Sequence, residues 1–328
     1  DFSYTFLGDI MLKSRAIRKI FITTLSLFIF LVVYSLPTLD NSYVLKTNLE
    51  IESTTGLATD NIYLLNDDGY LVKSRVLLEG PTLEDRIAEV LDQLTVRDEN
   101  HFPKGLFPYI PKGTKVLNIL HGEGKVTVDF SHEFLNMDVY TEKQIISGVV
   151  FSILDLGDVE EVIILVEGEV LREYPNTKED LSSPLTKNIG INQEYNLTSR
   201  DDISKVVIYY LSRINDEMYY VPVTKYLNDS RDKIKIIIDE LSTSYIYEPN
   251  LMSFLHSQVE LLDYYEQENV LFLNFNKFLF DSDDKVLEEV LYSISYSVFD
   301  NYDVSMVMFE VNDQYVGQVS REGDIERK

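Results

Sequence analysis

The sequence contains one structural unit twice. Asp129 lies in a strand-like run that is followed by an apolar helical pattern and by a β-branched run beginning at Asp158. Asn274 and Asp303 occupy the same two places later in the chain, and each pair is separated by 145 positions. Two separate landmarks with one offset indicate an internal duplication, because chance rarely preserves such a spacing. The fold must therefore be built from two copies of one unit.

The duplication defines the domain boundaries. The first copy spans residues 61–171 and the second spans 205–319, with an interdomain linker at 172–204 and a C-terminal tail at 320–328. Each copy has the order hairpin, helix, hairpin, helix, closing strand, and each helix carries one apolar stripe. A helix with one apolar stripe packs on one sheet face. We predict an α+β fold of two similar domains, each a small mixed or antiparallel sheet with two helices packed on one face.

Local signals place the ends of the helices and the most buried strand. Thr82 and Thr141 are each followed three positions later by Asp or Gln, which is typical of a capping box. Ser282 is the expected N-cap of the last helix. The dense β-branched run Val159–Val166 is predicted to be a central strand buried on both faces. Residues 189–195 of the linker are apolar enough to dock on a domain.

A hydrophobic stretch precedes the first copy. Residues 20–36 are uncharged, follow four basic residues and end before Pro37. These 17 residues approach the lower limit for a helix that spans a membrane. The basic side is expected in the cytoplasm, so the single-pass protein would lie in the cell membrane with most of its chain on the extracytoplasmic side.

Two alternatives to a transmembrane anchor remain, a cleaved signal peptide and a buried core helix. The run is longer than a usual signal-peptide core, and Tyr34-Ser35-Leu36 lacks the small-x-small cleavage pattern. Residues 1–19 are the expected cytoplasmic segment, of which 1–10 could be an extension, since Met11 is a more natural start. Residues 37–60 are the expected linker between anchor and first domain.

Composition excludes several kinds of partner and site. The net charge is −26, and residues 1–40 contribute +1, so the remainder carries −27. Such a surface repels nucleic acid and anionic lipid, and favours either plain solubility or a basic partner. Cysteine is absent, which excludes disulfides, thiolate metal sites and lipidated cysteine. The four His residues are scattered, with no helical ligand spacing.

One cluster of polar residues suggests catalysis. Asp129, Ser131, His132 and Glu133 are close in sequence. Strand alternation places Asp129 and Ser131 on one face and His132 on the other, so these neighbours cannot form a triad by themselves. We interpret them as a structural strand end. The sequence predicts no catalytic, cofactor-binding or metal-binding residues.

Two further patterns have structural interpretations. Asp67 and Asp68 could bind calcium, but they lack the spacing of a calcium loop and fit a hairpin turn. The glycines of the first copy could form a phosphate loop, but no Lys-Ser/Thr pair follows at a helix start. These glycines are Gly105, Gly113, Gly122 and Gly124.

The second copy is rich in tyrosine. Its tyrosines can fill the core and sheet surface, or form a contact face for protein or glycan, because tyrosine supplies contact area at low entropic cost. They are Tyr209, Tyr210, Tyr219, Tyr220, Tyr245, Tyr247, Tyr264 and Tyr265.

Three motifs of the first copy resemble one known family. The loop Ile110-Pro-Lys-Gly-Thr114, the strand Val126-Thr-Val-Asp-Phe-Ser131 and the ending Val162-Ile-Ile-Leu-Val-Glu-Gly-Glu169 follow in the order found in GerMN domains of sporulation and spore germination proteins. The resemblance covers about residues 60–171 strongly and 205–317 weakly. The second copy lacks the Ile-Pro-x-Gly-Thr loop and has Asn274-Phe-Asn276 in place of Asp-Phe-Ser. Because the sequence has no cysteine to which a lipid could be attached, residues 20–36 would have to hold the protein in the membrane in place of a lipid anchor.

The resemblance implies a function without chemistry. GerMN domains look like the ring-building domains of secretion-type complexes and are regarded as non-catalytic. The expected protein is a membrane-anchored scaffold that assists an envelope assembly, such as the mother cell–forespore channel. Its expected partners are envelope or sporulation-complex proteins, with no nucleic acid and with oligomers possible. The alternative is an extracytoplasmic cell-wall or ligand-binding module, and an envelope hydrolase ranks last.

Overall fold

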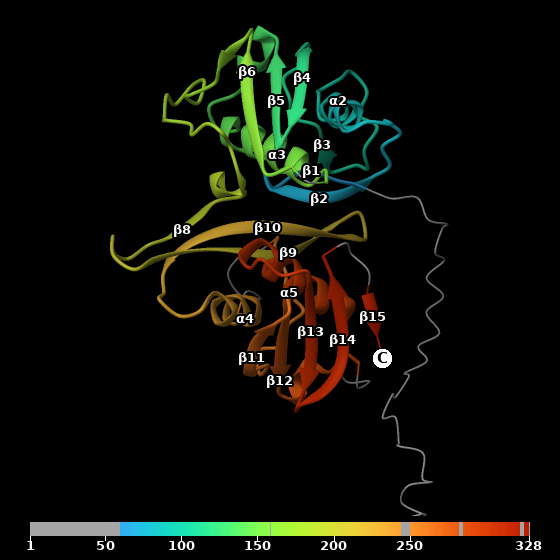
Figure 1. The fold of residues 1–328 in the computed structure, drawn as a ribbon, viewed down its shortest axis with the longest axis vertical. Coiled ribbons are helices and arrows are strands. Elements are labelled where there is room, and N and C mark those ends of the chain that lie inside the picture. The colour runs from blue at the N-terminus through green and yellow to red at the C-terminus, as the bar shows by residue number, and fades with distance from the viewer. Residues whose placement is uncertain (1–59, 158, 244–249, 282–284, 322–324, 328) are drawn as a thin grey trace, which may run out of the picture. The chain divides into compact units, whose positions relative to one another are not determined.

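The computed structural model describes residues 60–157, 159–243, 250–281, 285–321 and 325–327 (Figure 1). The predicted cytoplasmic segment, anchor and linker at 1–59 and the cap Ser282 lie outside these residues. Within the described ranges, no helix is both long and apolar enough to cross a bilayer.

The first copy has the predicted order of elements. A first hairpin is followed by a helix, a second hairpin, a second helix and a closing strand. Two two-residue strands and a short 3-10 helix, His132–Leu135, are added to this plan. The elements are β1 Asp60–Asn66, β2 Leu71–Val76, α2 Leu83–Gln93, β3 Leu106–Phe107, β4 Val116–Gly122, β5 Lys125–Phe130, α3 Glu142–Leu154, β6 Glu161–Val166 and β7 Glu169–Val170.

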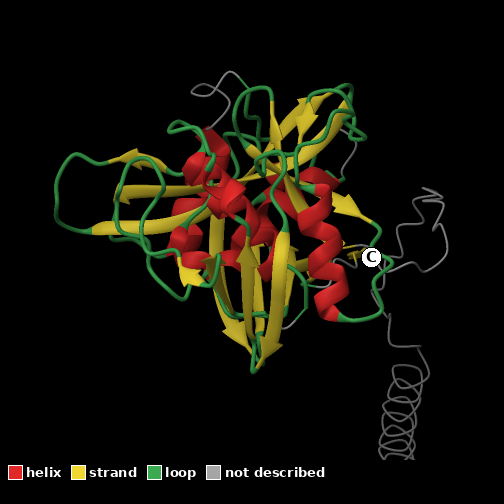
Figure 2. Cartoon of the chain, turned by 90° about the horizontal axis from the view of Figure 1, so that it is seen from above, coloured by secondary structure: helices red, strands yellow, loops and turns green. Residues whose placement is uncertain are grey.

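The second copy repeats this order with longer first strands. Figure 2 shows the helices and strands of both copies, as an α+β fold requires. The elements are β9 Ile203–Ile214, β10 Glu217–Asn228, α4 Lys233–Thr243, β11 Leu261–Gln267, β12 Val270–Phe275, the 3-10 helix Lys277–Leu279, α5 Glu288–Asn301, β13 Met306–Val311, β14 Gln314–Ser320 and β15 Ile325–Arg327.

The duplication extends to strand register. One sheet has the order β4-β5-β6-β7 and another has β11-β12-β13-β14-β15. In each, one parallel pair lies between antiparallel pairs, β5 with β6 and β12 with β13. Asp129 pairs with Leu165, and Asn274, 145 positions later, pairs with Glu310. The sequence repeat is therefore a structural repeat built on mixed sheets.

The expectation of one sheet per copy is wrong for the first hairpins. The hairpin β1-β2 of the first copy and β9-β10 of the second join in one six-stranded sheet, in which β2 and β10 are antiparallel at Lys73 and Tyr220. The reason lies in the second helices. Every residue of α3 from Ile145 to Leu154 is buried, and this stretch has no charged residue. A helix buried all round must be covered on more than one side. Helix α3 contacts both β1 and β6, and α5 contacts both β9 and β13.

The predicted helix caps have different outcomes. Thr82 is confirmed as the N-cap of α2, because its hydroxyl accepts a hydrogen bond from the Asp85 N–H at 3.2 Å. Thr141 is not a side-chain cap of α3. Its Oγ1 donates to the Asp138 carbonyl instead. Helix α5 begins at Glu288 with Leu287 as its N-cap residue, so it starts later than expected.

The strand predicted at 159–166 is an inner strand, but it is not buried on both faces. In β6, buried Val162, Ile164 and Val166 alternate with half-buried Glu161, Ile163 and Leu165. One face packs on the core and the other stays open, as is usual where helices cover only one side of a sheet. The β-branched composition did not predict this, because it is found both in strands buried on one face and in strands buried on both faces.

The segment predicted as a linker at 172–204 belongs to the folded body. Leu181, Leu185 and Ile191 are buried in the common core. The strand β8, Glu194–Asn196, pairs in parallel with β10, and a 3-10 helix occupies Lys187–Ile189. The docking predicted for residues 189–195 is confirmed. The two copies are thus joined by a structured segment.

Candidate functional site

The two copies meet around a tyrosine of each first strand. In the first copy, the main-chain N–H of Tyr63 donates to Ser152 Oγ at 3.0 Å, and the Tyr63 hydroxyl donates to Asp155 Oδ2 at 2.9 Å. Ser152 lies in α3 and Asp155 is its C-cap residue. The end of α3 is thereby fixed to β1 by one main-chain and one side-chain hydrogen bond.

The second copy has the same arrangement. The Tyr209 N–H donates to Ser297 Oγ at 2.9 Å, and the Tyr209 hydroxyl donates to Asp300 Oδ2 at 2.7 Å. Ser297 and Asp300 each lie 145 positions after their counterparts in the first copy. No landmark used to detect the repeat included these residues, so their agreement is independent evidence for the duplication.

Two lysines neutralise the paired carboxylates. Lys187, from the segment between the copies, lies 3.5 Å from Asp155 Oδ1 and 2.7 Å from Asp300 Oδ1. Lys73 of β2 lies 3.0 Å from Asp155 Oδ2, and its Nζ lies 5.0 Å from the ring centre of Tyr296. Lys187 therefore contacts one carboxylate of each copy.

The electrostatics keep this cluster in one charge state. Burial would raise the pKa of Asp155, but Lys73 and Lys187 outweigh it and hold that pKa at about 2. Burial also raises the pKa of the Tyr63 and Tyr209 hydroxyls well above their ordinary value. At neutral pH the Asp155 carboxylate is therefore ionised, and the two tyrosines are protonated donors. Such a fixed arrangement is suited to holding two domains together and offers no proton to exchange with a substrate.

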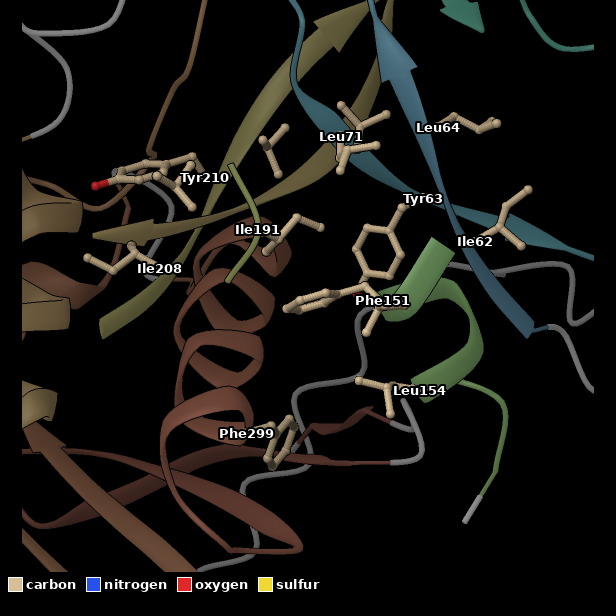
Figure 3. Close-up of a cluster of buried hydrophobic side chains, with 14 of the residues drawn as sticks. Ile62, Tyr63, Leu64, Leu71, Phe151, Leu154, Ile191, Ile208, Tyr210 and Phe299 are labelled. Carbon is tan, nitrogen blue, oxygen red and sulfur yellow. The ribbon is translucent and has the colours of Figure 1, made fainter. Parts of the chain in front are cut away.

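An apolar core surrounds the cluster and is continuous across the copies. Figure 3 shows Tyr63 on β1 above Phe151 of α3, and Ile208 and Tyr210 of the second copy belong to the same group of buried side chains. The rings of Tyr63 and Phe151 meet edge to face at 5.8 Å between centroids. The junction is therefore packed like a domain interior.

A side chain of the connecting segment completes the shared sheet. Asn192 Oδ1 accepts from the Leu71 N–H at 2.9 Å, and its Nδ2 donates to the carbonyls of Leu71 and Pro222 at 2.8 and 2.7 Å. Pro222 lies inside β10, where it has no N–H to offer a neighbouring strand. The amide of Asn192 supplies the missing pairing between β2 and β10.

Two of the residues that suggested catalysis, Asp129 and Ser131, have structural roles. Asp129 Oδ1 accepts the Gly168 N–H at 3.0 Å, and in the second copy Asn274 Oδ1 accepts the Asp313 N–H at 3.1 Å. Asn274 occupies the position of Asp129 and Asp313 that of Gly168. An amide therefore accepts in the second copy the same main-chain hydrogen bond that a carboxylate accepts in the first. Ser131 Oγ accepts the Lys115 N–H at 3.0 Å, which ties the end of β5 to the chain entering β4.

The other predicted alternatives also lie in turns. Asn66 Oδ1 accepts from the Asp68 and Tyr70 N–H groups, and Asp68 Oδ1 accepts from Asn250 Nδ2 at 2.7 Å. The glycines considered as a phosphate loop are dispersed, since Gly122 ends β4 and Gly124 lies in the β4-β5 turn, while Gly105 precedes β3. Among the described residues, no group of three or more His, Cys, Asp or Glu is placed to hold a metal ion.

The tyrosines of the second copy do not form a common exposed face. Tyr209 and Tyr210 are buried, and Tyr219, Tyr220 and Tyr264 are half-buried, while Tyr265 is exposed. Tyr245 and Tyr247 lie outside the described residues. The interpretation as core and sheet surface fits the buried pair, and Tyr265 remains as an exposed aromatic contact.

Exposed apolar residues recur at matching places on the outer strand of each mixed sheet. Leu117 of β4 is 52% exposed and Leu262 of β11 is 50% exposed, and each lies in a register irregularity 145 positions from the other. Leu120 and Tyr265 form a second exposed pair with this offset. Sequence reasoning missed them because exposure cannot be separated from burial in a short apolar run. The 145-residue offset is the signal that could have singled them out.

Comparisons with known proteins agree with the duplicated fold. Residues 61–172 and 207–317 each match the family described as "Germane: Sporulation and spore germination". The chain belongs to this GerMN family. The GerMN relative "Spore germination protein GerM" of Bacillus subtilis is 28% identical over 263 residues, which cover 76% of this chain and 70% of that protein. The solved tandem GerMN domains of B. subtilis GerM match with a TM-score of 0.71 at 27% identity, covering 78% of this chain and 91% of that structure. This homology supports a role in sporulation or germination.

Proposed function

We propose that this GerMN protein is a non-catalytic scaffold of sporulation or germination. It would be anchored in the cell membrane through residues 20–36, with its two copies on the extracytoplasmic side. There it would assist assembly of an envelope complex such as the channel between mother cell and forespore. Its partners would be proteins of that complex.

The use of the polar residues at the junction supports this proposal most directly. The tyrosine, serine and aspartate of each copy satisfy one another, and Lys187 bridges the two carboxylates. These polar interactions fix one copy against the other. The outer surfaces of the two copies are then held at a constant distance from each other, which suits a scaffold that binds partners through both copies. The matched exposed positions Leu117 and Leu262 are candidates for those surfaces.

A localisation and crosslinking experiment tests the proposal. In a spore-forming host that encodes the chain, a photo-crosslinking residue at position 120 should capture an envelope protein during sporulation. The same residue at the buried position 164 is the control and should capture nothing. Accessibility of the C-terminal half to external protease in protoplasts would establish its side of the membrane. A cytoplasmic location, or unchanged spore formation and germination after gene deletion, would contradict the proposal.

The second candidate is an extracytoplasmic wall- or ligand-binding module. One observation favours it, a polar hollow of about 210 Å³ between α3 and the connecting segment. Sedimentation with purified peptidoglycan separates the candidates. A scaffold that acts only through proteins should stay in the supernatant, whereas a wall-binding module should sediment.

A further inference from the structure

A small hollow beside the junction of the copies is lined by lysines. It has a volume of about 90 Å³, and two of its lining residues, Lys187 and Asp300, belong to the junction described above. The others include Asn188 of the connecting segment, Lys205 of β9 and Lys233 of α4. Helix α4 contacts β9, so the two lysines reach the hollow from neighbouring elements (Figure 1).

Two of these lysines have no counter-charge. Neither Lys205 nor Lys233 forms an ion pair within the part of the chain that the structure describes. The Lys205 ammonium donates to the main-chain carbonyls of Lys187 at 3.2 Å and of Asn188 at 2.9 Å, and these carbonyls do not neutralise its charge. The chain has 55 acidic and 29 basic residues, so adjoining lysines without a carboxylate are unexpected in it.

The carboxylate in the lining is already engaged. The Asp300 side chain is 6% exposed, and its Oδ1 lies 2.7 Å from Lys187 Nζ. Its Oδ2 accepts from the Tyr209 hydroxyl at 2.7 Å. Asp300 therefore serves the junction and leaves the charges of the other two lysines uncompensated.

The electrostatics of Lys205 reflect this missing charge. Burial lowers the pKa of Lys205, and the nearby Lys233 lowers it further. A lysine in such surroundings pays free energy to remain charged. An anion that contacts both ammonium groups would offset that cost, because each new hydrogen bond would join opposite charges.

We propose that this hollow binds one small oxyanion of the phosphate type. The ammonium groups of Lys205 and Lys233 would donate to its oxygens, and the exposed Asn188 can add an amide N–H. These donors come from three elements of the fold. A tetrahedral ion offers oxygens in all these directions, whereas a carboxylate offers two oxygens in one plane. The volume is sufficient for several water molecules, and hence for such an ion.

The rest of the protein restricts the ligand to a small ion. A net charge of −26 repels a polyanion along its whole length. A single ion meets mainly the adjacent lysines, because salt screens charges beyond about 8 Å. The first turn of α4 is not required, since the Ile234 N–H already donates to the Tyr302 hydroxyl at 2.8 Å. The inference does not depend on the scaffold role, because a scaffold can bind an ion as well as proteins.

Calorimetric titration of the full chain with inorganic phosphate tests the proposal. The chain is kept in a detergent without a phosphate headgroup, and chloride holds the ionic strength constant. We expect saturable binding of one phosphate per chain. Dimethyl phosphate represents the phosphodiester of a polymer or lipid headgroup, and whichever of the two binds more tightly identifies the source of the phosphate group. Acetate, which is also an oxyanion but is not tetrahedral, should bind about tenfold more weakly than phosphate.

Variants then assign the binding to the hollow. Lys233→Gln removes one exposed ammonium group, and Lys205→Met removes the half-buried one. Each should weaken phosphate binding about tenfold, the effect of one lost charge-assisted hydrogen bond. Lys235→Gln is the matched control, because Lys235 is exposed two positions further along α4 and its ammonium stands 5.8 Å from the ring centre of Tyr264. This control should bind phosphate like the parent chain, and thermal unfolding of each variant confirms that it is folded.

Three outcomes would overturn the proposal. The first is the absence of saturable binding of phosphate and of dimethyl phosphate. The second is binding of acetate as tight as that of phosphate, which would assign the lysines to a general attraction for anions. The third is an equal effect of Lys233→Gln and Lys235→Gln, which would show that net charge and not the hollow determines the affinity.

Discussion

In both copies a tyrosine of the first strand is held by a serine and an aspartate at the end of the second helix. Only the first copy's aspartate, Asp155, also contacts a lysine of its own copy, Lys73. Among the described ion pairs, Asp300 contacts Lys187 alone. The second copy therefore depends on the connecting segment for its counter-charge. The contacts among tyrosine, serine and aspartate are thus the same in both copies, whereas the lysines that contact the two aspartates differ. The connecting segment supplies the lysine that the second copy does not provide itself.

The helices at the centre of each copy differ in one close contact. Gly148 of α3 corresponds to Ser293 of α5. A Cβ at position 148 would lie 2.3 Å from the Tyr109 hydroxyl oxygen and 3.0 Å from Leu71 Cδ2. The side chain of Ser293 is buried, and its Oγ has no hydrogen-bond partner. In the first copy, the missing side chain at Gly148 therefore leaves room for the hydroxyl end of Tyr109.

Replacing Gly148 should have the largest effect. Gly148→Ser should lower the free energy of unfolding by about 3 kcal/mol, because the buried ring of Tyr109 cannot move away without disturbing the core. Ser293→Ala is the matched control and should change it by less than about 1 kcal/mol, since no hydrogen bond is lost. Urea unfolding of both variants measures the difference. Equal stability of the two variants would mean that α3 and α5 tolerate the same side chains.

Acid should weaken the junction through the first copy's aspartate. The folded-state pKa of Asp155 is about 2, below its ordinary value, so its contribution is present at neutral pH and is lost as the pH falls from about 4 through 2. The expected loss is about 2 kcal/mol. Unfolding free energies measured between pH 6 and 2 should decline less steeply in Asp155→Asn than in the parent chain. Identical slopes would exclude Asp155 as the titrating group.

Removing the shared cation tests the asymmetry directly. Lys187→Met leaves Asp300 without its described counter-ion, while Asp155 retains Lys73. The Lys187 side chain is 42% exposed, so solvent moderates the loss, and we expect about 1–2 kcal/mol. Hydrogen exchange should rise more at the end of α5 than at the end of α3. Lys143→Met, which removes a surface ion pair with Glu179, is the control and should cost less than about 1 kcal/mol. Equal exchange at both helix ends would show that the two carboxylates share the cation evenly.

The sequence was sufficient for the local elements and insufficient for the way in which the copies join. Val126, Val128 and Phe130 alternate with polar residues, and the predicted one-sided strand is confirmed. The pairing of Lys73 with Tyr220 joins strands about 150 positions apart and has no local signal. The charge-free stretch Ile145–Leu154 was the available clue that a second layer must cover α3.

The candidate site was predictable only in part, for a related reason. The structural interpretation of Asp129 and Ser131 followed from strand alternation, and their hydrogen bonds to main-chain N–H groups agree with it. The junction was not predicted, because Lys187 meets Asp300 across 113 positions and lies in a segment expected to be a linker. Polar linker composition can reflect buried pairing as well as solvation, and sequence alone does not separate the two.

The smallest expected effect on stability concerns the outer strands. Leu120 and Tyr265 are exposed at matching positions of β4 and β11, so replacing Leu120 with Lys should change the unfolding free energy by no more than about 0.5 kcal/mol. Replacing Tyr265 with Lys should cost no more than about 1 kcal/mol, because its ring also stacks on Phe272. Their functional effects should differ. Strand β4 has no charged residue, whereas β11 carries Asp263 and Glu266, and charges on an outer strand discourage pairing with another chain. Leu120→Lys should therefore reduce spore formation or germination more than Tyr265→Lys. A larger defect from Tyr265→Lys would assign the main contact surface to the second copy.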